Sequence, residues 1–127
     1  MPSERMQRRY AFSKSRRLRH RDDFAAVFET KVREARGPLV VYARPNDLGH
    51  ARLGLSTSRK VGTAARRNRI RRLLREAFRY LQHDLPAGYD LVIVVRPHEP
   101  LTLAEYQKLL SALAVKLHTA WSKKTGF

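Results

Sequence analysis

The spacing of apolar residues divides the chain into short helices and strands. Phe24, Val27 and Phe28 lie at positions i, i+3 and i+4, so they share one face of a predicted helix. Two adjacent aspartates fall in its first turn, where carboxylates favour the positive end of the helix dipole. The mixed segment 31–37 follows, and it could add one more short strand.

Three further segments have the residues of strands. Residues 39–43 and 52–58 flank the turn-forming segment 44–49, which predicts that the two strands pair as an antiparallel hairpin. Residues 89–95 form a continuous apolar run rich in β-branched residues. That pattern is typical of a central strand covered on both faces.

Two longer helices complete the pattern. The first has an unbroken apolar stripe: Ile70, Leu73, Leu74, Ala77, Phe78 and Leu81. The second opens with Thr102 and Glu105 in the spacing of a capping box. Its predicted buried face consists of Leu103, Tyr106, Leu110, Leu113 and Leu117, with Trp121 near the end. The predicted order is α-β-β-(β)-α-β-α, an α+β fold with helices layered on a sheet.

The length of 127 residues favours one domain, which we place at residues 18–121. Residues 1–17 carry six basic side chains against one acid, and we expect a disordered arm there. Residues 122–127 are expected to form a frayed tail.

Composition narrows the class of partner. Lys and Arg number 27 and Asp and Glu 11, which gives a net charge of +16. Such an excess favours a polyanion or an anionic membrane surface as the partner. The chain has no cysteine, which excludes disulfides, thiolate zinc sites, iron–sulfur clusters and a cysteine nucleophile.

A membrane is the less favoured of those partners. The longest apolar run, residues 91–95, is far shorter than the ~20 residues that span a bilayer. The N-terminal residues lack the apolar stretch of a secretory signal peptide. We expect a cytoplasmic protein without a membrane partner, and an organellar transit segment is the minor alternative.

The segment 59–79 concentrates positive charge, because it holds nine cations and a single acid, Glu76. Like charges three or four residues apart on a helix repel by ~0.2–0.5 kcal/mol per pair, and solvated faces usually mix signs to avoid this. Arginine is also the cation whose planar fork matches phosphate bidentately. The segment therefore predicts a surface that binds a nucleic-acid backbone. The alternative is a solvated basic face that binds no specific ligand.

The entry to this helix carries the features of an anion site. Hydroxyls, cations and a glycine converge over residues 56–62, where a helix N-terminus presents unpaired N–H groups. The spacing does not match the phosphate loop of nucleotide hydrolases. Asn68, a poor helix former, lies on the polar face; spacing alone leaves open whether it binds a ligand or is a tolerated surface residue.

Phe24, Phe28 and Tyr42 have two interpretations. Their spacing favours core packing, and the alternative is a stacking platform for unpaired bases, worth ~1–3 kcal/mol per base. Catalytic arrangements are missing from the sequence, because the five histidines form no close pairs and the acids are scattered. The residues by themselves indicate a protein that binds RNA or DNA and supplies no chemistry of its own.

Residues 52–62 and 65–78 resemble the signature of the bacterial ribonuclease P protein subunit. The core of the match is Arg67-Asn68-Arg69, preceded by Lys60-Val61-Gly62, and the resemblance extends over most of residues 18–120. It implies that the catalyst is a partner RNA, which removes the 5′ leader of precursor tRNA with Mg²⁺ held mainly by that RNA. This chain alone would be inactive, with the catalytic RNA and precursor tRNA as partners and no obligate protein partner.

The resemblance also implies two sets of site residues. Contacts with the catalytic RNA would come from Ser58, Arg59, Lys60, Arg66, Arg67, Asn68, Arg69, Arg72 and Arg75. Contacts with the leader would come from Phe24, Phe28, Tyr42, Arg33 and Arg36.

The fold implied by the resemblance is a two-layer sandwich like that of ribosomal protein S5 domain 2, with a left-handed β-α-β crossover. General principles alone predict the right-handed form. Two other functions stay open at this point. One is a ribosome-associated structural protein that binds rRNA, and the other is a stand-alone nuclease that would depend on Asp22, Asp23 or Glu76.

Overall fold

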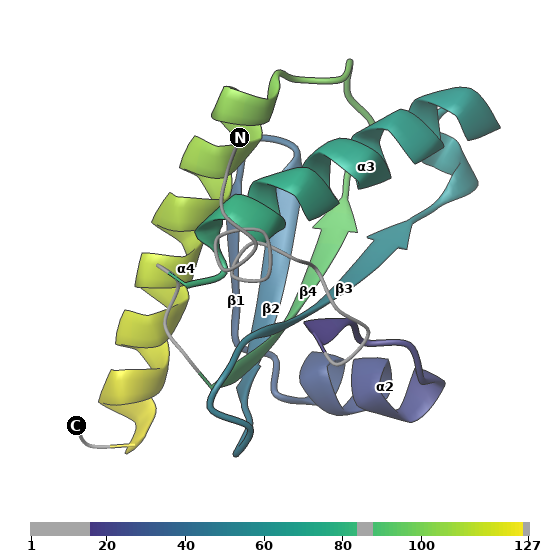
Figure 1. Cartoon of the computed structure of the whole chain (residues 1–127). Coiled ribbons are helices and arrows are strands. Elements are labelled where there is room, and N and C mark those ends of the chain that lie inside the picture. Colours follow the sequence, from purple (N-terminus) through teal and green to yellow (C-terminus); the bar gives the residue numbers. More distant parts are fainter. Residues whose placement is uncertain (1–15, 84–87, 126–127) are drawn as a thin grey trace, which may run out of the picture.

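The helices and strands follow the predicted order, with the extra strand included (Figure 1). The structure is a computed structural model that describes residues 16–83 and 88–125. Its elements are helix α2 (Arg21–Glu29), strands β1 (Arg33–Arg36), β2 (Leu39–Pro45) and β3 (Arg52–Thr57), the short 3-10 helix η2 (Arg59–Val61), helix α3 (Ala64–Leu81), strand β4 (Tyr89–Val95) and helix α4 (Leu103–Thr125). The fold class is α+β, as predicted.

The four strands form one mixed sheet in the order β1-β2-β4-β3. Strand β2 is antiparallel to both β1 and β4, whereas β3 is parallel to β4. The predicted hairpin between residues 39–43 and 52–58 is therefore wrong, because β4 lies between these two strands. The hairpin of this sheet joins β1 to β2 through Gly37, whose φ of 57° suits a residue without a side chain.

The composition of β4 explains why it takes the central place. Leu91, Ile93 and Val95 belong to the main core on one side of the sheet, while Val92 belongs to a smaller core on the other. A strand that is apolar on both faces is stabilised most where both faces are covered. The prediction of a central strand at residues 89–95 is confirmed.

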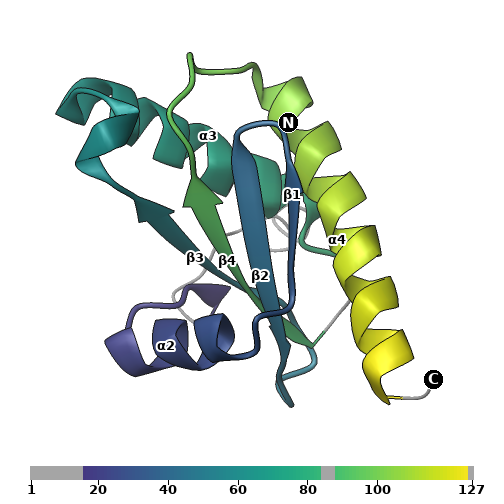
Figure 2. The same cartoon turned by 180° about the vertical axis from the view of Figure 1, so that it is seen from behind.

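Helices cover the two faces of the sheet unequally. Helices α3 and α4 pack on one face around the main core, and α2 packs on the other (Figures 1 and 2). The predicted stripe of α3 faces the sheet, with Ile70, Leu74, Ala77 and Phe78 fully buried. The opposite side of α3 therefore faces solvent.

The connection from β3 through α3 to β4 is left-handed. In Figure 1 both strands point upward, α3 lies in front of the sheet, and β4 lies to the left of β3. This agrees with the implied family fold and departs from the common right-handed crossover. It places α3 on the same face of the sheet as α4.

Local signals in the sequence define the starts of both long helices. The Thr63 hydroxyl caps α3 by accepting a hydrogen bond from the Arg66 N–H at 3.2 Å. The capping box predicted for α4 is present: Glu105 N–H donates to the Thr102 hydroxyl at 3.2 Å, and Thr102 N–H donates to the Glu105 carboxylate at 3.1 Å.

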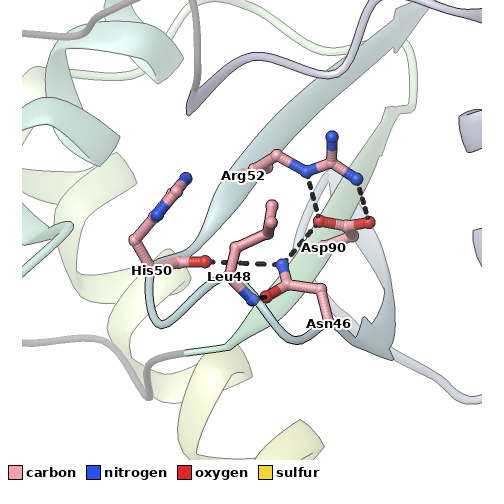
Figure 3. Close-up of polar contacts among 5 residues, drawn as sticks. All are labelled: Asn46, Leu48, His50, Arg52 and Asp90. Atoms are coloured by element: carbon pink, nitrogen blue, oxygen red, sulfur yellow. Dashed lines mark hydrogen bonds and ion pairs between the residues drawn. The ribbon is translucent and has the colours of Figure 1, made fainter.

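A buried carboxylate ties together the ends of β2, β3 and β4 (Figure 3). Asp90, only 3% exposed, accepts two hydrogen bonds from the Arg52 guanidinium, at 2.7 and 2.8 Å. It also accepts one from the Asn46 amide at 2.7 Å. Asn46 in turn accepts a bond from Leu48 N–H and donates to the His50 carbonyl, which shapes the loop between β2 and β3.

The ends of the domain differ slightly from the predicted bounds. Arg17 already pairs with Leu53 at the free edge of β3, and Leu18 N–H donates to the Leu53 carbonyl at 2.8 Å. Helix α4 continues past 121 to Thr125. Residues 1–15 of the arm predicted over residues 1–17, and the last two residues of the chain, lie outside the described part of the chain. Within residues 16–83 and 88–125, no helix is both long and apolar enough to cross a membrane.

Candidate nucleic-acid interface

The solvent side of α3 and the turn before it form a continuous basic surface, which we call the arginine face. Its members are the nine residues predicted to contact a catalytic RNA: Ser58, Arg59, Lys60, Arg66, Arg67, Asn68, Arg69, Arg72 and Arg75. Arg66 and Arg67 are partly buried, and the other seven are exposed. The buried stripe fixes this orientation, because apolar packing on the sheet turns the polar residues outward.

Few acids neutralise the arginine face. Glu76 pairs with Arg79 on the same helix. Glu99, which is 82% exposed, lies 3.2 Å from Arg66. Exposed ion pairs of this kind contribute only ~0–1 kcal/mol to the free energy of unfolding. The surface is therefore suited to a partner of dense negative charge.

The aromatic residues gather on the other face of the sheet, where we call Phe24, Phe28 and Tyr42 the aromatic surface. All three are partly buried and pack on the small core of Leu18, Val27 and Val92. Phe28 and Tyr42 meet edge to face, with ring centroids 4.9 Å apart. The rings thus pack against the core and also keep part of their area open to a ligand.

The two predicted arginines of the leader set lie in different places. Arg33 joins the aromatic surface: its Nη1 donates to the Tyr42 hydroxyl at 3.1 Å, and its guanidinium carbon lies 5.9 Å from the ring centroid. Arg36 instead lines a separate hollow with Leu101 and Leu109, on the side of the sheet covered by α4. The structure does not bring Arg36 together with the aromatic residues.

One arginine outside the predicted sets lies between the arginine face and the aromatic surface. Arg71 lies one helical turn from both Arg67 and Arg75, and it lines a hollow beside β3 together with Arg75 and Phe24. The i, i+4 spacing of Arg71 from Arg67 is the sequence signal that could have added it to the predicted set. Burial, followed by the charges of Arg17 and Arg71, lowers the pKa of Arg75 below its ordinary value.

Metal ligands are not grouped in the described residues. Within 16–83 and 88–125, no three His, Asp or Glu side chains come together in a way that could hold an ion.

Comparison with known proteins bears directly on this site. The family model for ribonuclease P matches residues 12–120. The chain is 42% identical over 104 residues to the ribonuclease P protein component of Photobacterium profundum, covering 81% of this chain and 88% of the relative. It is 41% identical over 118 residues to that of Legionella pneumophila (strain Lens), covering 92% and 96%.

Solved structures agree with the sequence comparison. The Staphylococcus aureus RNase P protein superposes with a TM-score of 0.70 at 30% identity, covering 79% of this chain and 93% of that one. The Thermotoga maritima RNase P protein gives a TM-score of 0.69 at 35% identity, covering 77% and 94%. With the arginine face and the fold on which it lies, these matches decide among the functions that the sequence left open: the chain belongs to the family of bacterial ribonuclease P protein components.

Proposed function

We propose that this subunit of the ribonuclease P endonuclease binds two RNAs at two surfaces. The arginine face binds the catalytic RNA, and the aromatic surface with Arg33 binds the single-stranded 5′ leader of precursor tRNA. The bound leader is thereby positioned for cleavage by the catalytic RNA.

The arginine face supports the first contact by charge and geometry. Its guanidinium groups project from helix α3 and, for Arg59, from the turn before it, and each can form two parallel hydrogen bonds to a phosphate. The one acid on the helix, Glu76, is paired with Arg79. A folded RNA with closely spaced phosphates is the partner that offsets repulsion among these arginines.

The observation that carries the leader proposal is the partial exposure of three packed rings beside Arg33. Stacking needs unpaired bases, and single-strand binding surfaces combine aromatic rings with cations that follow the backbone. Phe24, Phe28, Tyr42 and Arg33 provide both on one face of the sheet. A protein that only bound folded rRNA would have no need of such rings.

The chemistry is assigned to the RNA partner. Mg²⁺ bound by that RNA would activate water and stabilise the leaving oxygen. In line with the family resemblance, we place Mg²⁺ mainly on the catalytic RNA and assign no catalytic residue to this chain.

Cleavage of precursor tRNA at low Mg²⁺ tests the proposal. The reaction contains a bacterial ribonuclease P RNA with this protein, the RNA without it, or the protein alone. We expect cleavage only where RNA and protein are both present. Cleavage by the protein alone would contradict the assignment of catalysis to RNA, and no stimulation of the RNA would contradict the subunit role at this site.

Arg69→Ala tests the arginine face. Loss of one charged hydrogen-bonding group from an RNA contact weakens binding about tenfold, or ~1.4 kcal/mol. We expect the variant to need more Mg²⁺ for half-maximal cleavage, because cations then replace the missing charge. Lys116→Ala, at an exposed position of α4, is the matched control, and an unchanged Mg²⁺ titration for Arg69→Ala would count against the arginine face.

A further inference from the structure

A hollow of about 330 Å³ lies at the free edge of the sheet, between the arginine face and the aromatic surface. The segment before α2, the side of β3 and the middle of α3 enclose it. Its lining residues are Arg17, Leu18, Arg19, Phe24, Leu53, Leu55, Arg71 and Arg75. We call it the edge pocket.

The lining of the edge pocket has a simple chemical division. Half of its residues are arginines and the other half are apolar, with no acid among them. The arginines come from two segments far apart in sequence, residues 17–19 and helix α3. The fold therefore brings four positive charges to one small concavity.

Two observations indicate that this arrangement is built around an anion. Arg71 donates to the Thr57 carbonyl at 3.4 Å, which holds its guanidinium at the pocket. Burial, followed by the charges of Arg17 and Arg71, lowers the pKa of Arg75, which agrees with several guanidinium groups lying close together at the pocket. Arginines draw together in this way where phosphate offsets their repulsion.

We propose that the edge pocket binds one phosphodiester group of RNA. Arg71 and Arg75 hold the phosphate from α3, Arg19 holds it from the segment before α2, and Leu53, Leu55 and Phe24 contact the attached sugar or base. This inference rests on the proposed function, because RNA is the ligand there as well. It adds Arg19 and Arg71 to the binding residues.

The position of the edge pocket gives it a role that neither larger surface has. It shares Arg75 with the arginine face and Phe24 with the aromatic surface. These two surfaces lie on opposite sides of the sheet, and the pocket joins them around the β3 edge. A phosphate bound here fixes the path of an RNA strand that passes from one surface to the other.

The phosphate can belong to the catalytic RNA or to the leader, and binding measurements distinguish the two sources. The variants are Arg71→Gln, Arg19→Gln and the double variant, with Lys116→Gln as the matched loss of charge elsewhere. One measurement is the Kd of the protein for the catalytic RNA across a salt titration. The other is the ratio of holoenzyme affinities for precursor and mature tRNA.

We expect the double variant to bind its RNA about tenfold more weakly, with a salt slope shallower by about 1. A change in the Kd for catalytic RNA assigns the phosphate to that RNA. A change in the precursor-to-mature ratio assigns it to the leader. If both quantities match those of Lys116→Gln, the edge pocket does not bind RNA and the proposal is overturned.

Two controls keep the result interpretable. Thermal unfolding of each variant shows whether the fold is intact, and Arg71→Lys, which keeps the charge but not the planar fork, should restore binding only in part. Failure of the proposed function is a separate outcome: the wild-type protein would then not stimulate the RNA at all. If the wild type stimulates and the variants bind equally well, only the edge pocket is rejected.

Discussion

Phe24 illustrates how one side chain can serve both packing and binding. Its ring covers the small core with Leu18 and Val27, yet it also lines the edge pocket. The residue spacing alone favoured a core role for this ring. The partial burial is consistent with that role and leaves area for a base.

Phe24→Leu separates the two roles. Leucine keeps apolar cover over the core but removes the stacking ring, so we expect precursor tRNA to bind more weakly by ~1–3 kcal/mol. Mature tRNA, which lacks the leader, should bind as before. The measurement is holoenzyme affinity for both RNAs, and an equal loss for the two would assign Phe24 to packing alone.

Asp90 has a structural role that the sequence did not indicate. Asp90→Ala leaves the Arg52 guanidinium and the Asn46 amide without their acceptor. We expect the free energy of unfolding to fall by ~1–3 kcal/mol. Urea denaturation measures it, with Asp47→Ala, at an exposed loop position, as the control. Equal stability of the two variants would argue against the network of Figure 3.

Strand β3 has a glycine, Gly54, where the Phe24 ring of helix α2 lies over it. A Cβ atom built on Gly54 would lie 2.6 Å from Cζ of Phe24 and 3.1 Å from Cβ of Leu18. The close approach of the Phe24 ring and Leu18 to β3 therefore favours a residue without a side chain at this position. This contact sets the position of the Phe24 ring relative to the sheet.

Gly54→Ala is expected to displace the Phe24 ring and so affect stability and leader binding together. Overpacking of this kind lowers the free energy of unfolding by ~1–3 kcal/mol. The affinity of the holoenzyme for precursor tRNA should also fall relative to its affinity for mature tRNA. Thermal unfolding and the same pair of affinities measure the two effects. Ser56→Ala, two residues along the same strand, controls for a change in β3 itself. If Gly54→Ala has the unfolding temperature and the tRNA affinities of the wild type, the position of the Phe24 ring does not depend on this glycine.

The whole molecule distributes its two binding chemistries over opposite sides of one sheet. Charge is concentrated on α3, while the partly exposed rings lie beside α2. These contacts differ in their response to salt, because phosphate contacts release counterions whereas stacking does not.

A salt titration should therefore separate the two surfaces. We expect affinity for the catalytic RNA to fall steeply with salt, with a slope of about −0.9 per phosphate contact. The preference of the holoenzyme for precursor over mature tRNA should fall much less steeply. Equal slopes would mean that charge, and not stacking, recognises the leader.

The sequence by itself determined the elements and the chemistry of the basic helix. Apolar spacing located α2, α3 and α4, and the Thr102 and Glu105 pair located the start of α4, because these signals are local and need only the helical period. The apolar run of β4 also predicted its central place. The density of arginine in residues 59–79 indicated a polyanion before any geometry was known.

The tertiary structure alone decided how those elements are joined. A short turn between two strand patterns favoured a hairpin of residues 39–43 with 52–58, but pairing also depends on which strand gains most from burial, and β4 takes the place between them. The family resemblance grouped Arg36 with the aromatic residues, yet the alternation of β1 places it on the α4 side. Arg17, Arg19 and Arg71 meet at one pocket because the segment before α2 pairs along β3 and α3 packs on the adjoining face of the sheet. Local patterns carry no information on contacts between distant segments, since these depend on how the whole chain buries its apolar surface.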